Sequence, residues 1–461
     1  MNHPVSSDLI RGLHSNKSNL IKTWFIILMA WLTMLLVSVF LVEDVSAQSN
    51  EADRVVALRA GQVLEVETGN LIPNAVVLIR GERIEAVGPG VAIPSGAEVI
   101  DLSDYVVLPG LIDAHTHVCI QPNYAAKNPI LYKSIPYRTV EAVNAARATV
   151  EAGFTTIRDI DSEGADWADV AVRDGINDGL VPGPRMQVAT LAISITGGYM
   201  NQVGLAPQID VPQFGALADS PAALVAEVRR QVKYGTDWIK IYATGTTRNI
   251  DPKTMEPLPQ FSYDELKLVV DEAARFRIPV AAHAYGGPGA KNAIRAGVRS
   301  IEHGFFLDDE ALDMMVERGT FWVPTISVYI PDTPRAEWGA VRTVIIDSHA
   351  ETIRRAAEKG VKIAYGTDAG ALPHGDNAID FERMVAYGMS PLQAVQSATL
   401  VAAELMDMSD DVGTLSPGAF ADVIAVPANP LDDVATLGDV RFVMKGGTVI
   451  KHEALSTAAR R

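Results

Sequence analysis

The 461-residue sequence is poor in cysteine and in positive charge. Cys119 is its only cysteine, which excludes a disulfide bond within the chain. Most lone cysteines are small buried hydrophobic residues, and we expect this of Cys119, although its place two residues after His117 leaves a minor role in a site open. Lysine and arginine number 39 against 56 aspartates and glutamates, which gives a net charge of −17. An acidic protein of this kind argues against nucleic acid and anionic membranes as binding partners.

One long hydrophobic run, Thr23–Val42 (TWFIILMAWLTMLLVSVFLV), lies near the N-terminus. The small residues of Val45-Ser46-Ala47 that follow resemble the site cut by signal peptidase. We expect residues 1–48 to be a cleaved export signal, or an uncleaved anchor, because the run is long enough to span a bilayer. In either case the remaining chain would be exported, as a periplasmic or secreted protein or as one held at the membrane by residues 23–42.

The rest of the chain shows two kinds of pattern. Residues 49–108 and 411–461 consist of short strand-like stretches and turns, and they predict one small β-sandwich domain formed by both chain ends. Residues 109–410 alternate strand-like and helix-like stretches, which predicts an α/β fold, a (β/α)8 TIM barrel. A doubly wound sheet is the competing fold, but it would usually place a glycine-rich phosphate-binding loop after its first strand, and none is present. The expected barrel strands are residues 111–117, 155–160, 185–193, 238–244, 279–284, 300–304, 321–326 and 362–368.

Metal-binding residue types recur at the ends of these strands. His115 and His117 stand two residues apart, so a strand would point both imidazoles to the same side, where they can hold one divalent metal ion. Lys240 alternates with two isoleucines and would point towards the barrel axis, where an unpaired ammonium is costly. It could pair with a buried carboxylate, or it could take up carbon dioxide and become a carbamate able to bridge two metals. Together with three further strand-end residues, these side chains form a candidate binuclear metal site: His115, His117, Lys240, His283, His303 and Asp368.

Seven short motifs, PGLIDAHTH, TTIRD, WIKIYATG, HAYG, IEHG, GTDAG and PGAFADVIAV, spread over residues 53–455. Together they resemble the amidohydrolase superfamily, which implies a barrel carrying a β-sandwich. The resemblance implies that His115, His117 and Asp368 bind one metal ion and that His283 and His303 bind the other. Carboxylated Lys240 would bridge the two ions. Zinc is the expected metal, with manganese and cobalt as alternatives.

Within the superfamily the chain looks most similar to relatives of imidazolonepropionase, a branch that includes Xaa-Pro dipeptidases and ochratoxin-hydrolysing amidases. The shared features are GPR at 183–185, TGG at 196–198 and PHG at 373–375. This resemblance implies hydrolysis of an amide bond that releases a C-terminal amino acid from a dipeptide or an N-acyl amino acid. Asp368 would take a proton from the attacking water and pass it to the leaving amine.

Candidate partners for the substrate are Tyr242, Arg248 and His374. Each has an alternative role: Tyr242 could fill the barrel interior, Arg248 could be a solvated charge on a loop, and His374 could be a surface residue of a loop. Tyr199 stands where many relatives have a histidine, which puts the fit of the substrate in doubt. The substrate is expected to be a small molecule or dipeptide, and the protein a homo-oligomer. A hydrolase of lactones, cyclic amides or phosphotriesters on the same site is the alternative function. A metal-free binding protein is disfavoured because no candidate ligand is missing.

Overall fold

The computed structural model describes residues 24, 28–29, 54–122, 124–246, 249–251, 253–330 and 341–453. The chain divides into a unit of residues 1–55 and a unit of residues 56–461, and the second unit holds nearly all the elements described below. The predicted export segment and Arg248 lie outside the described residues, apart from Trp24, Leu28 and Met29 of that segment. Among the described residues, no helix has both the length and the apolar character needed to cross a membrane.

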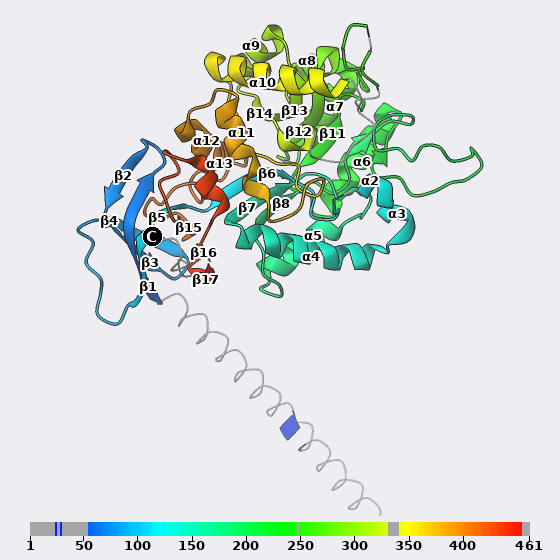
Figure 1. The fold of residues 1–461 in the computed structure, drawn as a ribbon. Helices are drawn as coiled ribbons and strands as arrows, with labels where there is room; N and C mark the ends of the chain where they lie inside the picture. The colour runs from blue at the N-terminus through cyan, green and yellow to red at the C-terminus, as the bar shows by residue number, and fades with distance from the viewer. Residues whose placement is uncertain are drawn as a thin grey trace, which may run out of the picture. The chain divides into compact units, whose positions relative to one another are not determined.

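Strands from both ends of the second unit build a single eight-stranded sheet, in the order β17-β16-β15-β5-β1-β3-β4 with β2 paired to β1 (Figure 1). Strand β5 is the junction, because it pairs in parallel with β1 and antiparallel with β15. The additional β domain expected from the sequence is therefore present. Its strands are β1 (Val55–Glu65), β2 (Asn70–Pro73), β3 (Val76–Arg80), β4 (Arg83–Gly88), β5 (Glu98–Pro109), β15 (Val423–Val426), β16 (Phe442–Lys445) and β17 (Thr448–His452).

This sheet lies between two hydrophobic cores. Val107 of β5 packs into a core within the β domain, whereas its neighbours Val106 and Leu108 pack into the core of the barrel. The same alternation appears in β15, where Ala425 faces the β-domain core and Ile424 the barrel core. Successive side chains of a strand point to opposite faces, so a strand of continuous apolar residues can join two cores.

The central segment forms a parallel barrel. Its strands lie in two sheets, β6-β7-β8 and β10-β9-β11-β12-β13-β14, and the backbone amide of Trp238 joins them by donating to the Val188 carbonyl at 3.0 Å. The predicted (β/α)8 fold is thus confirmed. The strands are β6 (Leu111–Thr116), β7 (Phe154–Asp159), β8 (Arg185–Val188), β9 (Ile193–Ser194), β10 (Ala216–Leu217), β11 (Ile239–Tyr242), β12 (Val280–Gly286), β13 (Ser300–Phe306) and β14 (Phe321–Val323).

Two predicted strands differ in detail from the structure. The stretch 185–193 splits into β8 and β9 because Thr190 has left-handed backbone, with φ of +54°. The eighth stretch, 362–368, forms isolated bridges rather than a regular strand, and Asp368, with φ of +62°, turns the chain out of extended geometry. This stretch still closes the barrel, because Ala364 N donates to Trp322 O at 2.9 Å and Asp368 N donates to His115 O at 2.8 Å.

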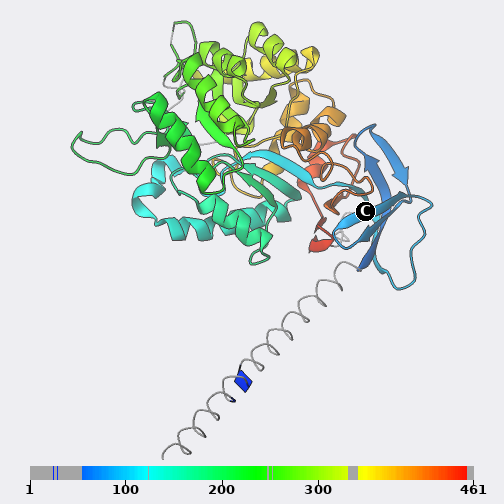
Figure 2. The same cartoon turned by 180° about the vertical axis from the view of Figure 1, so that it is seen from behind.

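Helices surround the barrel strands, as Figures 1 and 2 show. Several begin at the caps expected from local sequence: Ser262 and Glu265 form a capping box, and Ser220 caps α6 ahead of Pro221. The helices are α2 (Tyr124–Lys127), α3 (Pro129–Tyr132), α4 (Ile135–Glu151), α5 (Ala168–Asn177), α6 (Pro221–Lys233), α7 (Tyr263–Ala274), α8 (Gly287–Ala296), α9 (Asp309–Arg318), α10 (Val341–Lys359), α11 (Asp380–Ala386), α12 (Pro391–Ser397) and α13 (Leu400–Leu405). The 3₁₀ helices are η2 (Ser327–Tyr329), η4 (Asn377–Ile379) and η5 (Val434–Gly438).

Candidate metal centre

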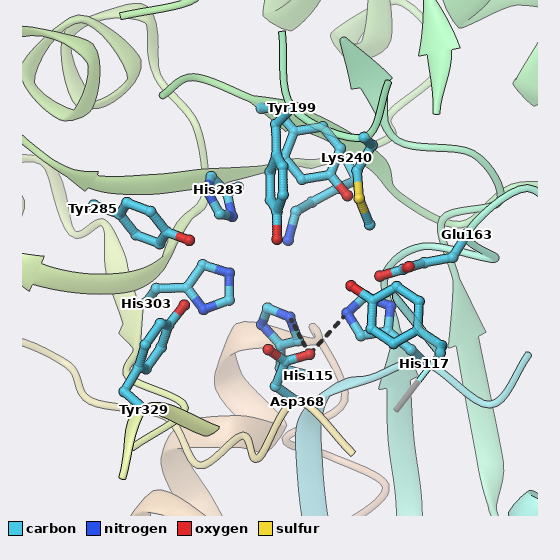
Figure 3. A pocket seen from close by; sticks show the side chains of 13 residues that line it. His115, His117, Glu163, Tyr199, Lys240, His283, Tyr285, His303, Tyr329 and Asp368 are labelled. Carbon is cyan, nitrogen blue, oxygen red and sulfur yellow. Dashed lines mark ion pairs between the residues drawn. The ribbon is translucent and has the colours of Figure 1, made fainter. Parts of the chain in front are cut away.

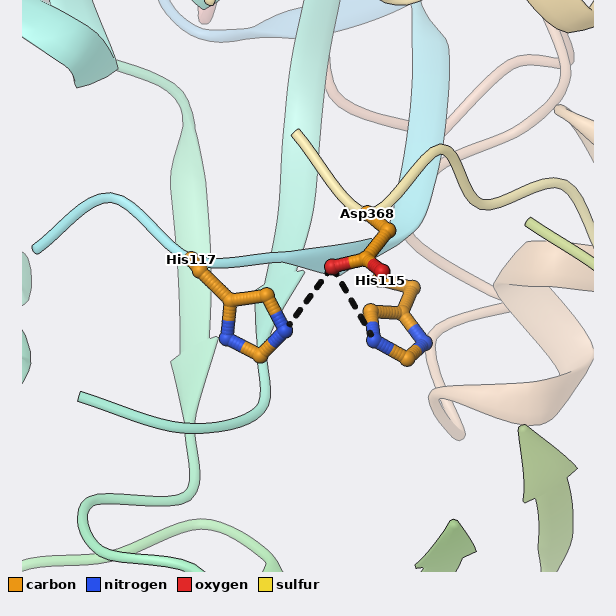
Figure 4. A group of neighbouring side chains, drawn as sticks. All are labelled: His115, His117 and Asp368. Atoms are coloured by element: carbon orange, nitrogen blue, oxygen red, sulfur yellow. Dashed lines mark ion pairs between the residues drawn. The ribbon is translucent and has the colours of Figure 1, made fainter. Parts of the chain in front are cut away.

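The two histidines of the first barrel strand meet Asp368 at the carboxyl end of the barrel. Asp368 Oδ1 lies 3.2 Å from His117 Nε2 and 3.9 Å from His115 Nε2 (Figure 4). Asp113 ties the two segments together, because it accepts hydrogen bonds from the His115 amide at 3.1 Å and from Thr367 Oγ1 at 2.6 Å. One potential ligand atom from each of His115, His117 and Asp368 lies within 4.8 Å of the others, a spacing suited to a single metal ion.

Protein contacts to Nδ1 orient three of the four candidate histidines. Nδ1 of His115 lies 2.8 Å from Glu302 Oε2, Nδ1 of His117 lies 3.0 Å from the Asp161 carbonyl, and Nδ1 of His303 lies 2.8 Å from Thr325 Oγ1. The buried Nε2 atoms of His115 and His283 have no hydrogen-bond partner among the described residues. Metal-binding histidines are held in this way, with one ring nitrogen fixed by the protein and the other left for the metal. The residues present therefore fit a metal site.

The charge state of most of these rings also suits metal binding. Burial lowers the pKa of His115, His283 and His303 well below the usual value, with a further lowering from Lys240. They are therefore neutral imidazoles, the form that ligates metal ions. His117 behaves differently. Burial lowers its pKa, but the hydrogen bond and charge of Asp368 outweigh this and raise it to about 10.

Lys240 lies on β11 between Ile239 and Ile241, both of which pack into the barrel core. Its side chain is buried, and no hydrogen bond or ion pair joins its Nζ to another described residue. The alternative of a buried lysine–carboxylate pair is therefore not seen among the described residues. Burial lowers the pKa of Lys240 to about 8; the negative charge of Glu302 opposes this shift, and the positive charge of Arg158 adds to it. Part of the lysine is then a neutral amine near neutral pH, the form able to take up carbon dioxide.

All six candidate ligands line one pocket, which is the arrangement that Figure 3 shows. They come from four strands, β6, β11, β12 and β13, and from the closing stretch, whose carboxyl ends converge as expected for a barrel. His303 and Asp368 both have left-handed backbone, with φ of +71° and +62°. Non-glycine residues adopt this conformation at a cost that usually accompanies a functional constraint. The other residues that line the pocket are Tyr124, Glu163, Tyr199, Met200, Tyr242, Tyr285 and Tyr329.

The structure places two of the candidate substrate-binding residues at the pocket and a third away from it. Tyr199 and Tyr242 line the pocket with ring centroids 4.8 Å apart, and Tyr242 donates a 2.6 Å hydrogen bond to Asp161 Oδ2. His374 does not line the pocket. It contacts the Ile120 carbonyl through Nε2 at 3.1 Å, and burial lowers its pKa to about 4. Arg248 lies outside the described residues. Cys119 is buried, as expected, and does not line the pocket.

Sequence reasoning missed several residues around the pocket. Glu302 lies in the motif IEHG, and Tyr285 shares a strand face with His283 two residues earlier, so strand alternation could have identified it. Glu163 follows β7 in an irregular segment, and Tyr329 is the last residue of the 3₁₀ helix η2; no local pattern points to either.

A sequence model described as amidohydrolase family matches residues 106–450. The ochratoxinase of Aspergillus niger is 31% identical over 439 residues, covering 88% of this chain and 88% of the relative. The imidazolonepropionase of Cutibacterium acnes is 27% identical, covering 77% of this chain and 85% of the relative. The crystal structure of a Xaa-Pro dipeptidase with bound methionine in the active site superposes with a TM-score of 0.78 at 36% identity, covering 87% of this chain and 100% of that one.

Proposed function

Because this chain belongs to the amidohydrolase family and is a metal-dependent hydrolase of amide bonds, we propose that it releases a C-terminal amino acid from a small amide. Dipeptides and N-acyl amino acids are the two substrate classes. The names of the ochratoxinase and the Xaa-Pro dipeptidase support this choice, since both proteins resemble this chain over most of its length. The observation that carries the proposal is the convergence of four histidines, Lys240 and Asp368 on one pocket.

We propose two divalent ions, with zinc as the metal. His115, His117 and Asp368 would hold one ion, and His283 and His303 the other. Lys240, carboxylated on Nζ, would contribute an oxygen to each, which accounts for a buried lysine whose amine contacts no described carboxylate. When bound, divalent ions at such a site polarise an amide carbonyl and lower the pKa of water.

The residues of the chain supply positioning and proton transfer. Asp368 is held by its backbone amide, which donates to the His115 carbonyl, so its carboxylate stays beside the two histidines. We propose that Asp368 accepts the proton that the attacking water loses as the new carbon–oxygen bond forms. The same carboxylate then delivers that proton to the nitrogen as the carbon–nitrogen bond breaks, so that a neutral amine leaves. The aromatic rings of Tyr199, Tyr285 and Tyr329 line the same pocket, where Tyr199 contacts the ring of His283 and Tyr285 contacts the ring of His303.

The test is a substrate screen on the purified, metal-loaded protein. A library of dipeptides and N-acyl amino acids is incubated with the protein, and free amino acid is measured by chromatography. The proposal predicts release of the C-terminal amino acid from part of the library. No release from any member, together with turnover of lactones, cyclic amides or phosphotriesters, would replace it with the alternative hydrolase function.

We also propose that the protein is exported, on the evidence of the hydrophobic run and the Val45-Ser46-Ala47 site alone. Mass spectrometry of protein from the native host should find an N-terminus near Gln48. An intact N-terminus in the membrane fraction would indicate an anchor, and full-length protein in the cytoplasm would contradict both.

A further inference from the structure

Glu163 is a buried acidic residue that the catalytic account above does not use. It follows β7, is 3% exposed, and lines the pocket beside His117 (Figure 3). Its backbone is fixed from two sides, because its amide donates to Asp161 Oδ1 at 2.8 Å and its carbonyl accepts from Arg138 Nη2 at 2.8 Å. Its φ of +49° is in the left-handed region, so this side chain is directed at the pocket at some conformational cost.

No ion pair joins the carboxyl group of Glu163 to a described side chain. Burial raises the pKa of Glu163 to about 8, although the positive charges of His117 and Arg138 act to lower it. Oε2 is buried and has no hydrogen-bond partner among the described residues. The nearby guanidinium of Arg138 does not donate a hydrogen bond to this carboxylate, because its hydrogen bonds go to the backbone carbonyls of Cys119, Ser162 and Glu163. A buried acceptor without a partner is costly, and a buried carboxylate is costlier still. A positively charged ligand group would remove this cost.

The position of Glu163 limits what that group can be. Figure 3 shows its carboxylate beside His117, across the pocket from His283 and Tyr285. In an unblocked dipeptide the α-amino nitrogen is two bonds from the carbonyl carbon that is attacked, a separation of about 2.5 Å from standard bond lengths. An ammonium so close to the reacting carbonyl must find its partner within the metal-site pocket itself. Among the residues that line the pocket, Glu163 is the acidic side chain other than the candidate ligand Asp368.

We propose that Glu163 binds the protonated α-amino group of the substrate, so that unblocked dipeptides are preferred over N-acyl amino acids. This inference rests on the proposed amide hydrolysis and narrows it to one substrate class. Ochratoxin-like amides, which lack such an ammonium, would then be poor substrates.

The experiment compares matched substrates that differ only in the amine. The best dipeptide from the screen is paired with its analogue in which hydrogen replaces the α-amino group, for example alanyl and propionyl forms of one amino acid. For the wild type, kcat/KM should be at least about tenfold higher for the dipeptide, as expected for a charge-assisted hydrogen bond. Glu163→Gln should lower kcat/KM for the dipeptide by at least about tenfold and change it less than about twofold for the analogue.

Two controls separate recognition from folding and from catalysis. Asp166→Asn alters an exposed carboxylate of the same loop and should leave both substrates unchanged. Ketomethylene isosteres of the pair, which cannot be hydrolysed, allow binding to be measured by calorimetry. The isostere with the amine should bind the wild type more tightly and lose this advantage in Glu163→Gln.

The outcomes are distinct. Equal kcat/KM for the two wild-type substrates would overturn the inference, as would a Glu163→Gln variant that loses both equally. If no amide is cleaved at all, the proposed function fails, and the two isosteres still decide whether Glu163 selects the amine.

Discussion

The most informative single perturbation is at Glu302, which links the candidate metal centre to a buried arginine. Glu302 Oε2 lies 2.8 Å from His115 Nδ1, and Oε1 lies 2.8 Å from Arg158 Nη2. The side chains of Glu302 and Arg158 are both fully buried. Arg158 also donates to the Ala114 carbonyl at 2.6 Å and stacks over Trp238, so it cannot move out to solvent.

Glu302→Gln should have two separable effects. It removes the negative charge opposite Arg158, and removing one partner of a buried ion pair costs about 3–5 kcal/mol of unfolding free energy. That is a large part of the roughly 5–15 kcal/mol typical of a folded protein. The amide nitrogen of the glutamine can also donate to His115 Nδ1, which moves the imidazole proton to Nε2, where the metal should bind. We expect metal affinity to fall about 10–100-fold, as for other substitutions of residues that hydrogen-bond to a metal ligand.

Urea unfolding of the metal-free protein and chelator competition measure the two effects separately. The double variant Arg158→Met/Glu302→Gln should recover unfolding free energy to within about 1–2 kcal/mol of the wild type, because the guanidinium that Glu302 pairs with is removed together with it. Its metal affinity should stay as low as that of the single variant. The control Glu85→Gln breaks an ion pair with Arg80 that is 42% and 48% exposed, and should cost less than about 1 kcal/mol. A loss below about 1 kcal/mol in Glu302→Gln, no recovery in the double variant, or unchanged metal affinity would refute the reasoning.

Three further predictions concern other residues. Lys240→Ala should lose both metal and activity. A short carboxylic acid that enters the space left by the lysine side chain should partly restore both. A Lys240→Ala variant that keeps two metals and normal turnover would contradict the bridging role. Asp368→Asn should lower turnover about a hundredfold or more while metal content, measured on the same sample, falls less, because the histidines and Lys240 remain. Near-normal turnover with metals bound would move proton transfer to another residue. His349 is buried and its pKa is lowered to about 3 by burial, so between pH 6.5 and 3 the unfolded state binds a proton that the folded state does not. The resulting acid destabilisation is about 1.4 kcal/mol per pH unit below 6.5, and His349→Gln should reduce the stability loss between pH 7 and pH 5 by about 2 kcal/mol in urea unfolding. An unchanged pH dependence would show that His349 does not contribute.

Regular patterns in the sequence predicted most of the fold. Alternating strand-like and helix-like stretches predicted the barrel. The short strand-like stretches and turns at both chain ends predicted the additional β domain. The errors fall where backbone geometry departs from the regular period. Thr190 interrupts one expected strand, and the closing stretch that ends at Asp368 forms only isolated bridges. Thr190 and Asp368 both adopt left-handed backbone, which the composition of the sequence does not reveal.

In the candidate site, too, some residues were predictable from the sequence and others were not. The residues at strand ends were predictable, since the carboxyl ends of barrel strands converge by topology. Glu163 reaches the pocket from the loop after β7, and Tyr329 reaches it from the short 3₁₀ helix η2. The paths of such connecting segments depend on long-range contacts, such as the hydrogen bonds of Arg138 to the loop after β7. The place of His374 after the last strand made it a candidate, but its Nε2 contacts the Ile120 carbonyl and the residue does not line the pocket.

We propose that this protein cleaves amides with two metal ions held in the pocket of His115 and Asp368. The most direct test removes the metals with a chelator, adds zinc back in measured steps, and follows both bound metal and release of amino acid from the best dipeptide. The account predicts no turnover in the stripped protein and full turnover at two equivalents of bound zinc. Undiminished turnover in the stripped protein, or full turnover at one equivalent, would contradict it.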